Sequence, residues 1–218
     1  MRSRSSFFAV ILIAFALMFH CSLVSYAAEP ATIKLPDPQK EGGKSVMAAL
    51  QSRMSSRSFS GEELPLQTVS NLLWAAFGIN RSSGHRTAPS AFNRQETDIY
   101  VITAEGVYLY DAKNNALDTV SKNDIRAMAG TQSYVKQAPV ILVYVADYSK
   151  VDGGSAESQL MVGADVGVIA ENVYLFCASE GLATVVRGAI DKDTLARALK
   201  LRPEQKIILD QPVGYPGR

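Results

Sequence analysis

One short stretch of the chain combines two arginines with several hydroxyl groups. Arg53, Ser55 and Arg57 alternate in the sequence RMSSRSF, where a predicted helix gives way to a loop. Guanidinium and hydroxyl groups this close together can bind a phosphate dianion through charge-assisted hydrogen bonds. Arginines four residues apart are also common on an ordinary solvated surface. Taken alone, the segment leaves both interpretations open.

Two further segments could contact the planar part of a phosphorylated cofactor. The sequence RTAPSAFNRQ contains Pro89, Ser90 and Asn93, which offer backbone and amide groups to the edge of a heterocycle. The sequence TVVRGA ends a predicted strand in Arg187 and Gly188, and glycine permits close backbone approach to a ligand. A polar surface loop and a simple chain turn would explain these segments equally well. Neither segment decides the function by itself.

The rest of the chain lacks the residues that most other catalytic sites require. Beyond residue 27 the sequence holds one histidine, His85, and one cysteine, Cys177, so a metal site built from these residue types is not expected. We find no G-x-S-x-G nucleophile motif and no glycine-rich nucleotide motif. The formal net charge of +1 gives no indication of nucleic-acid binding. Such a chain is either a binding module or relies on a cofactor for its chemistry.

Capping residues and hydrophobic periodicity predict helices mixed with strands. Because hairpins occur among the helices, we expect an α+β fold rather than a doubly wound parallel sheet. The long connection between Gly78 and Asp98 has no periodicity, and loops of this length are usually functional or disordered. The predicted helices cover residues 45–54, 66–77, 156–180 and 191–200, with a helical stretch around 123–129, and the predicted strands cover residues 99–103, 107–111, 139–146, 184–187 and 207–211.

The helix predicted over residues 156–180 is apolar on nearly every side. A helix of this kind is buried, either in the core of a domain or in a subunit interface. The hydrophobic content of 47% is ample for a packed core. The single cysteine beyond residue 27 excludes an intramolecular disulfide, so stability must come from the core or from a subunit interface.

The N-terminus has the pattern of an export signal. Arg2 and Arg4 precede an unbroken apolar run over residues 7–19, and Ser25 and Ala27 supply small residues at the positions that a signal peptidase inspects. The run is shorter than the roughly 20 residues of a membrane-spanning helix and fits a signal peptide. We expect a signal peptide over residues 1–27, an extended lead-in over 28–44 and one domain over 45–218. The mature protein would then be periplasmic or secreted, without stable membrane insertion; an uncleaved anchor is the alternative.

Taken in order, these segments resemble the FMN-dependent nitroreductase family from about residue 35 to residue 216. Arg53, Ser55 and Arg57 match the family's R-x-S-x-R/K phosphate motif, and residues 89–95 match its P-S-[SA]-x-N-x-Q segment. The stretch LLWAAFGIN over residues 72–80 is typical of the branch that is similar to azoline dehydrogenases, which make azoles in peptide natural products. The chain has no equivalent of the catalytic Lys-Tyr pair of those enzymes. Further similarities lie at Asp165, Gly167, Glu171, Asn172 and the closing VGYP over residues 213–216.

The resemblance implies a small, mainly antiparallel sheet flanked by helices, in an intertwined homodimer with the long helix at the twofold interface. FMN would bind at this interface and contact residues of both subunits. By the same resemblance, the phosphate would be held by Arg53, Ser55 and Arg57 and the ring by Pro89, Ser90 and Asn93, while Arg187 and Gly188 would face the pyrimidine side and Arg218 would complete the phosphate site. We also expect Arg187 to stabilise negative charge on the reduced flavin.

The activity implied by the resemblance is a ping-pong redox reaction. A donor would reduce FMN and leave, and an electron-poor acceptor such as a nitroaromatic or a quinone would then take its place. Dehydrogenation of another substrate through the same flavin is a variant of this hypothesis. The donor would be NAD(P)H in the cytosol and is undetermined for an exported protein. A secreted, non-catalytic binding module with a lost or repurposed flavin slot is the alternative.

Overall fold

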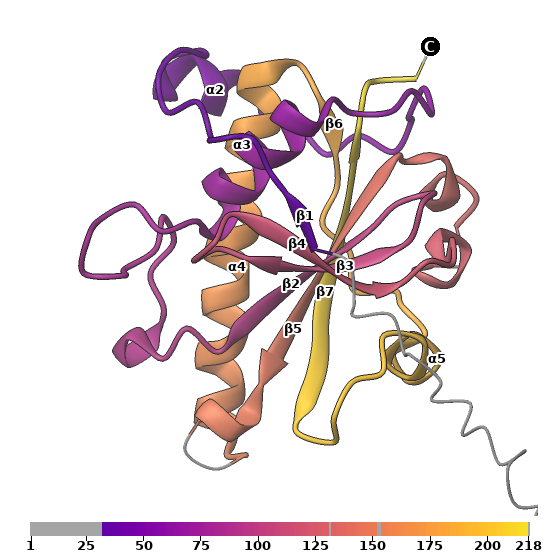
Figure 1. Ribbon diagram of the computed structural model, residues 1–218. Helices are drawn as coiled ribbons and strands as arrows, with labels where there is room; N and C mark the ends of the chain where they lie inside the picture. Colours follow the sequence, from indigo (N-terminus) through magenta and orange to yellow (C-terminus); the bar gives the residue numbers. More distant parts are fainter. Residues whose placement is uncertain (1–31, 131, 152–153, 218) are drawn as a thin grey trace, which may run out of the picture.

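A seven-stranded sheet forms the centre of the molecule (Figure 1). The computed structural model describes residues 32–130, 132–151 and 154–217, so the predicted signal peptide lies outside the described residues. Each neighbouring pair of strands is antiparallel, in the order β1-β4-β3-β2-β5-β7-β6. The α+β prediction with an antiparallel sheet is therefore confirmed. The strands are β1 (Thr32–Lys34), β2 (Thr97–Ile102), β3 (Val107–Asp111), β4 (Ala116–Ser121), β5 (Val140–Asp147), β6 (Ala183–Thr184) and β7 (Gln205–Gly214).

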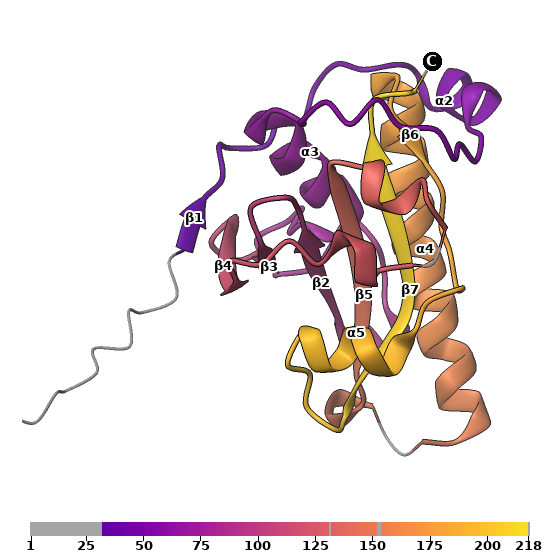
Figure 2. The ribbon, with the colours of Figure 1, turned by 90° about the vertical axis from the view of Figure 1, so that its right-hand side faces the viewer.

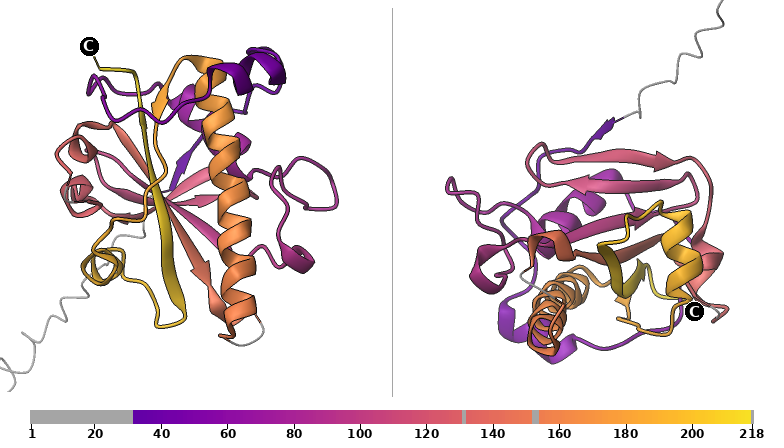
Figure 3. Two further views of the ribbon diagram at one scale, coloured as in Figure 1. Left: turned by 180° about the vertical axis from the view of Figure 1, so that it is seen from behind. Right: turned by 90° about the horizontal axis from the view of Figure 1, so that it is seen from below.

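Helices cover both faces of the sheet (Figures 2 and 3). The helices α3 (Leu66–Phe77) and α4 (Ala156–Glu180) lie on one face, and α2 (Val46–Ser52) packs beside the C-terminal end of α4. The helix α5 (Lys192–Ala198) covers the other face. Short 3-10 turns complete the description: η1 (Ala91–Asn93), η2 (Arg126–Met128), η3 (Val135–Gln137) and η4 (Tyr148–Lys150).

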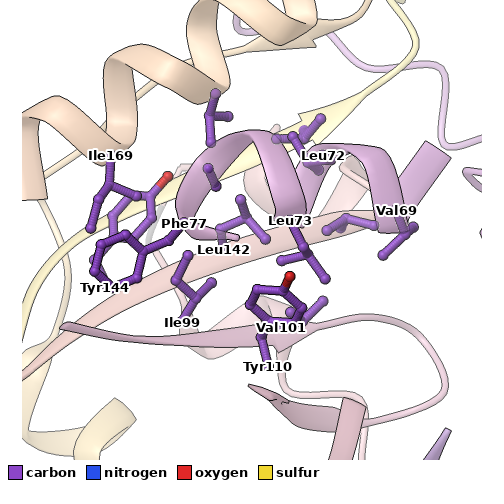
Figure 4. Packing of buried hydrophobic residues seen from close by; sticks show 14 of the residues in the cluster. Val69, Leu72, Leu73, Phe77, Ile99, Val101, Tyr110, Leu142, Tyr144 and Ile169 are labelled. Carbon is purple, nitrogen blue, oxygen red and sulfur yellow. The ribbon is translucent and has the colours of Figure 1, made fainter. Parts of the chain in front are cut away.

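The larger core lies between the sheet and the pair α3 and α4. Figure 4 shows Leu72, Leu73 and Phe77 of α3 pointing onto the sheet strands, with Ile169 of α4 beside them. The buried Tyr144 hydroxyl donates to Oε1 of Gln211 over 2.6 Å, so this polar group is satisfied inside the apolar core. A second core packs α5 and the turns η2 and η3 against the opposite face.

The rest of the described chain covers one side of α4 and leaves the opposite side exposed. The helix begins at Ser155, whose hydroxyl accepts the Ser158 amide, and ends at Gly181, which adopts the left-handed conformation with φ 71°. Its opposite side carries an exposed stripe at helical spacing, made of Leu160, Ala164, Gly167, Val168 and Glu171. α4 is the one helix of the described residues that is long and apolar enough to cross a membrane, but it packs onto the sheet as a core helix does.

Three details differ from the sequence prediction. β1 and β4 were not predicted, because β4 carries polar residues such as Asp118 and Thr119 that hide its alternation. The strand predicted over residues 184–187 is interrupted: the ladder of β6 ends at Thr184, and pairing with β7 resumes at Arg187 in an isolated bridge to Asp210. The Val186 amide donates to the Tyr174 hydroxyl instead of to a neighbouring strand. The predicted helical stretch around residues 123–129 is the single 3-10 turn η2.

Candidate functional site

The segment with the two arginines leaves α2 and runs beside the C-terminal half of α4. The guanidinium of Arg53 lies over the ring of Tyr174, at 5.2 Å from its centroid. Arg57 is exposed, and neither arginine forms an ion pair with a carboxylate of the residues that the structure describes. Two cations that the described chain leaves without a counter-charge can bind an anion, because that anion meets no competing carboxylate.

Tyr174 fixes the position of this segment. Its hydroxyl lies 2.8 Å from the Ser55 hydroxyl and accepts the Val186 amide over 2.9 Å. The Ser56 amide donates to the Thr184 carbonyl over 2.9 Å, which ties the segment to β6 a second time. Tyr174 is not among the site residues predicted from the sequence. A tyrosine on a helix predicted to be apolar on nearly every side is the signal that could have identified it, because its hydroxyl needs a hydrogen-bonding partner once it is buried.

A cavity of about 360 Å³ adjoins the same segment. Ser56, Tyr174 and Thr184 line it, together with Ser52 of α2 and residues at the C-terminal end of α4. Pro216, close to the end of the described chain, lies on the same wall. The predicted site residue Arg218 follows two positions later and lies outside the described residues.

The long loop between α3 and β2 is ordered by its own polar contacts. Arg86 donates through Nε to Oε1 of Gln95 and through one terminal nitrogen to the Phe77 carbonyl, over 2.8 and 3.0 Å. Gln95 in turn donates to the Gly84 carbonyl, and its amide donates to the Ser90 hydroxyl. The glutamine of the predicted P-S-A-x-N-x-Q segment therefore acts as the internal brace of the loop.

The part of this loop over residues 89–93 presents backbone and polar groups to solvent. Pro89 and Asn93 are exposed, and the exposed fraction of Phe92 reaches 87%. Phe92 and Asn93 both have φ of 55°, a left-handed conformation that is uncommon outside glycine. The Ala91 amide donates to Oδ2 of Asp165 on α4 over 2.8 Å. We call residues 89–93 the ring loop, after the role that the resemblance implies.

The ring loop and the arginine segment lie on opposite flanks of α4. Their contacts on the helix, Asp165 and Tyr174, are nine residues apart, which is about two and a half turns and roughly 14 Å along the axis. Figure 3 shows the loop on one side of α4 and residues 183–188 on the other. The exposed stripe of α4 runs between the two. One chain therefore brings the arginine segment close to residues 184–189 and keeps the ring loop apart from both.

Arg187 does not present its guanidinium to this surface. The side chain is buried and forms a bidentate ion pair with Asp210, with both nitrogen–oxygen distances between 2.8 and 2.9 Å. It also donates to the Ala129 carbonyl and to Oε1 of Gln132. Burial raises the pKa of Asp210 to about 6, and Arg187 partly offsets this rise. The expected charge-stabilising role would require the guanidinium to reach the flavin, whereas the described chain places it inside the protein.

Gly188, next along the chain, is exposed. A methyl group at this position would meet only Cδ2 of Leu209, at an ordinary van der Waals distance of 3.6 Å. The packing of the chain itself therefore does not require glycine here. The backbone at Gly188 is therefore open to solvent, and its predicted contact with the flavin stays a prediction.

Comparisons with known proteins agree on one family. The model of the nitroreductase family matches residues 50–215. A Methanocaldococcus jannaschii protein classed as a nitroreductase is 30% identical over 193 residues, which is 84% of this chain and 95% of that relative. The crystal structure of a Ralstonia eutropha protein, also classed as a nitroreductase, superposes with a TM-score of 0.81 at 39% identity, covering 86% of this chain and 90% of the other. A Desulfovibrio desulfuricans protein solved in complex with FMN shares the fold, with a TM-score of 0.60 at 22% identity, covering 81% and 89% of the two chains.

Proposed function

This chain belongs to the nitroreductase family, and we propose that it is an FMN-dependent oxidoreductase whose flavin site forms between two copies of the chain. One observation carries the proposal. The uncompensated cations Arg53 and Arg57 lie on one flank of the open stripe of α4, and the ring loop lies on the other flank. A second copy docked on the stripe in a twofold arrangement can bring its own ring loop to the arginine segment of the first.

The residues present fit FMN. Arg53, Arg57 and the Ser55 hydroxyl offer charge-assisted donors to a phosphate, and the surface at Gly188 allows a flat ring to approach the backbone. Hydrogen bonds to charged groups contribute about 1.5–3 kcal/mol each, whereas micromolar affinity needs about 8 kcal/mol. The two arginines fall short of this total, so burial of the ring beneath the ring loop of the partner supplies the remainder.

Exposed apolar side chains support the homodimer. On α4 the exposed fraction of Leu160 is 69%, and on the neighbouring α2 that of Met47 is 75%. A Cβ atom built on Gly163 or Gly167 would meet nothing within 4 Å, so both glycines face open space in the single chain. Exposed apolar surface of this kind favours a protein–protein contact, and small residues allow helices to approach closely.

Bound FMN supplies two-electron redox chemistry. The protein would hold the phosphate, orient the ring and leave one ring face open to a donor and then to an acceptor. His85 is exposed on the long loop and bonded to Ser83, so we assign it no catalytic role and take the proton from water. We propose ping-pong reduction of a nitroaromatic or quinone-like acceptor, with NAD(P)H as donor if the chain acts in the cytosol. The absence of the Lys-Tyr pair argues against azole formation, although we place the chain nearest that branch of the family.

Export is a separate proposal. It rests on Arg2, Arg4 and the apolar run over residues 7–19, which have the length and charge of a signal peptide. The exported enzyme would use a donor other than the cytosolic nicotinamide pool. Sequencing the N-terminus of the protein isolated from the producing cells tests this directly. A mature chain starting at residue 28 supports the proposal, and a chain retaining residues 1–27 contradicts it.

The test of the flavin function is an absorbance spectrum of the purified chain, with and without added FMN, after gel filtration. We expect flavin bands that co-elute with a dimer, bleach with dithionite and return in air. A folded protein that retains no FMN at any protein concentration would overturn the proposal and favour the non-catalytic binding module.

A further inference from the structure

A second cavity, of about 490 Å³, lies between the first turn of α3 and the strands β2, β3 and β4. It shares no lining residue with the cavity beside the arginine segment. β1 also borders it, and the strand order places β1 and β6 at opposite edges of the sheet. Small-molecule sites occupy roughly 300–1,000 Å³. The cavity is therefore separate from the proposed flavin site and large enough for a small organic molecule.

The floor of this cavity belongs to the larger apolar core. Two residues at its mouth, Gly61 and Ala104, are exposed and are too small to cover the floor. An apolar group that enters the cavity therefore contacts buried aliphatic side chains, and its removal from water favours binding. These buried side chains are Val69, Val101, Leu117 and Val140.

Two glutamates from different segments stand at the mouth. Glu63 lies in the connection before α3, and Glu105 lies in the hairpin turn between β2 and β3; both are exposed. Neither forms an ion pair with a cation of the described residues. Arg126 also lines the cavity, but two of its nitrogens bind the carboxylate of Asp124 over 2.8 and 3.0 Å. Because Asp124 neutralises Arg126, the two glutamates give the mouth a negative charge.

The hairpin turn holds one of these carboxylates in place. The Thr103 hydroxyl accepts the Glu105 amide over 3.1 Å, and Thr103 itself lines the cavity. Tyr108 adds a second hydroxyl-bearing side chain to the lining, and its exposed fraction is 7%. An apolar floor with a few polar groups at its border is the usual composition of a small-molecule site.

We propose that this cavity binds a small organic cation, an ammonium group carried on an apolar chain or ring. The apolar part lies on the floor, and the charged group meets Glu63 and Glu105. An anion of the same shape meets two uncompensated carboxylates, and a neutral molecule gains only the apolar contact. The inference goes beyond the proposed function, because no residue of the flavin site takes part.

The test uses three probes with one apolar body and different charges: phenylbutylamine, phenylbutanol and phenylbutyrate. Their binding to the full-length protein is measured by calorimetry at low ionic strength, with and without FMN, and located by the NMR shifts of backbone amides. We expect saturable binding of the amine in both conditions, with shifts at Gly61 and Ala104. Its affinity should exceed that of the alcohol by about two- to fivefold per carboxylate, as exposed ion pairs give, and phenylbutyrate should bind more weakly than the alcohol.

The matched variants remove charge without changing shape. In the double variant Glu63→Gln and Glu105→Gln, the amine should bind no more tightly than the alcohol, while the affinity for the alcohol stays the same. Glu62→Gln is the control, because Glu62 is an exposed neighbour that does not line the cavity, and it should keep the preference for the amine. Equal affinity for the three probes, a preference that survives the double substitution, or shifts outside the cavity would each overturn the proposal. Failure to retain FMN bears on the proposed function alone, since the probes are also tested without flavin.

Discussion

Replacing Arg187 by methionine separates a structural role of this residue from a direct role at the flavin. Methionine keeps an unbranched apolar stem but removes the charge and all the donors. Asp210 would then remain buried without its ion-pair partner, and the carbonyl of Ala129 and the side chain of Gln132 would each lose a donor. The geometry therefore predicts a large loss of stability and little direct effect on the flavin.

The size of this loss follows from the burial of the pair. The exposed fractions of the two side chains are 4% for Arg187 and 0% for Asp210. Removing one partner of a pair buried to this degree costs about 3–5 kcal/mol, because an uncompensated charge is left inside the protein. For a chain of 150–250 residues, each kcal/mol lowers the Tm by about 2–4 °C, so the expected decrease is roughly 6–20 °C.

The loss should depend on pH. The pKa of Asp210 in the folded protein, about 6, lies above its ordinary value of 3.8, so its ionisation already destabilises the wild type as the pH rises through 6. Arg187 is the group that lowers this pKa, and its removal raises the pKa further. The variant then keeps a protonated, neutral Asp210 at low pH but must bury a charge or bind a proton at high pH. The Tm difference between variant and wild type should be larger at pH 8 than at pH 5.

Thermal unfolding followed by circular dichroism at both pH values, with and without FMN, measures this. The control is the double variant with Asp210→Asn added, which removes the orphaned charge and should recover part of the Tm at pH 8. A variant with wild-type Tm but an altered flavin reduction potential would refute the reasoning and restore the direct role expected from the sequence. A Tm loss of equal size at pH 5 and pH 8 would refute the electrostatic part alone.

Three further predictions concern the flavin site and the interface. Tyr174→Phe keeps the ring beneath Arg53 but removes the hydroxyl bonded to Ser55 and Val186. FMN affinity, measured by titration of FMN fluorescence, should fall several-fold, and the free energy of unfolding in urea should fall by about 1–3 kcal/mol. Unchanged affinity would mean that this hydroxyl does not position the arginine segment. Gly167 faces open space in the single chain, so Gly167→Arg should leave the fold intact. We expect the variant to be a monomer in light scattering and to retain no flavin. A dimer that still binds FMN would exclude this stripe as the interface. Arg57→Ala should lower FMN affinity by about tenfold or more, because one charge-assisted donor contributes roughly 1.5–3 kcal/mol. The control Arg81→Ala, on the exposed part of the long loop, should leave FMN affinity unchanged. Equal losses of affinity in the two variants would argue against a phosphate site at Arg57.

Local signals in the sequence were sufficient for most of the architecture. α3, α4 and β3 have the predicted bounds, because each is delimited by a local signal: Pro65 and Gly78, Ser155 and Gly181, or the hairpin turn before Val107. The short strands β1 and β4 escaped prediction because their pairing with each other and with β3, rather than their own composition, makes them strands. The candidate residues of the arginine segment and the ring loop were likewise named from short motifs whose order, more than any single residue, carried the information.

The partners of the side chains were decided by the tertiary structure alone. Nothing local in the sequence indicates that Arg187 turns inward to Asp210, 23 residues away, or that the Tyr174 hydroxyl holds Ser55 across 119 residues of chain. The same holds for the ring loop, which the helical geometry of α4 places on the flank opposite the arginine segment. A sequence motif determines which chemical groups are available at a position. The direction in which they point depends on packing between segments distant in the chain, because burial of a charge or a hydroxyl is tolerated only where the fold brings its partner within hydrogen-bonding distance.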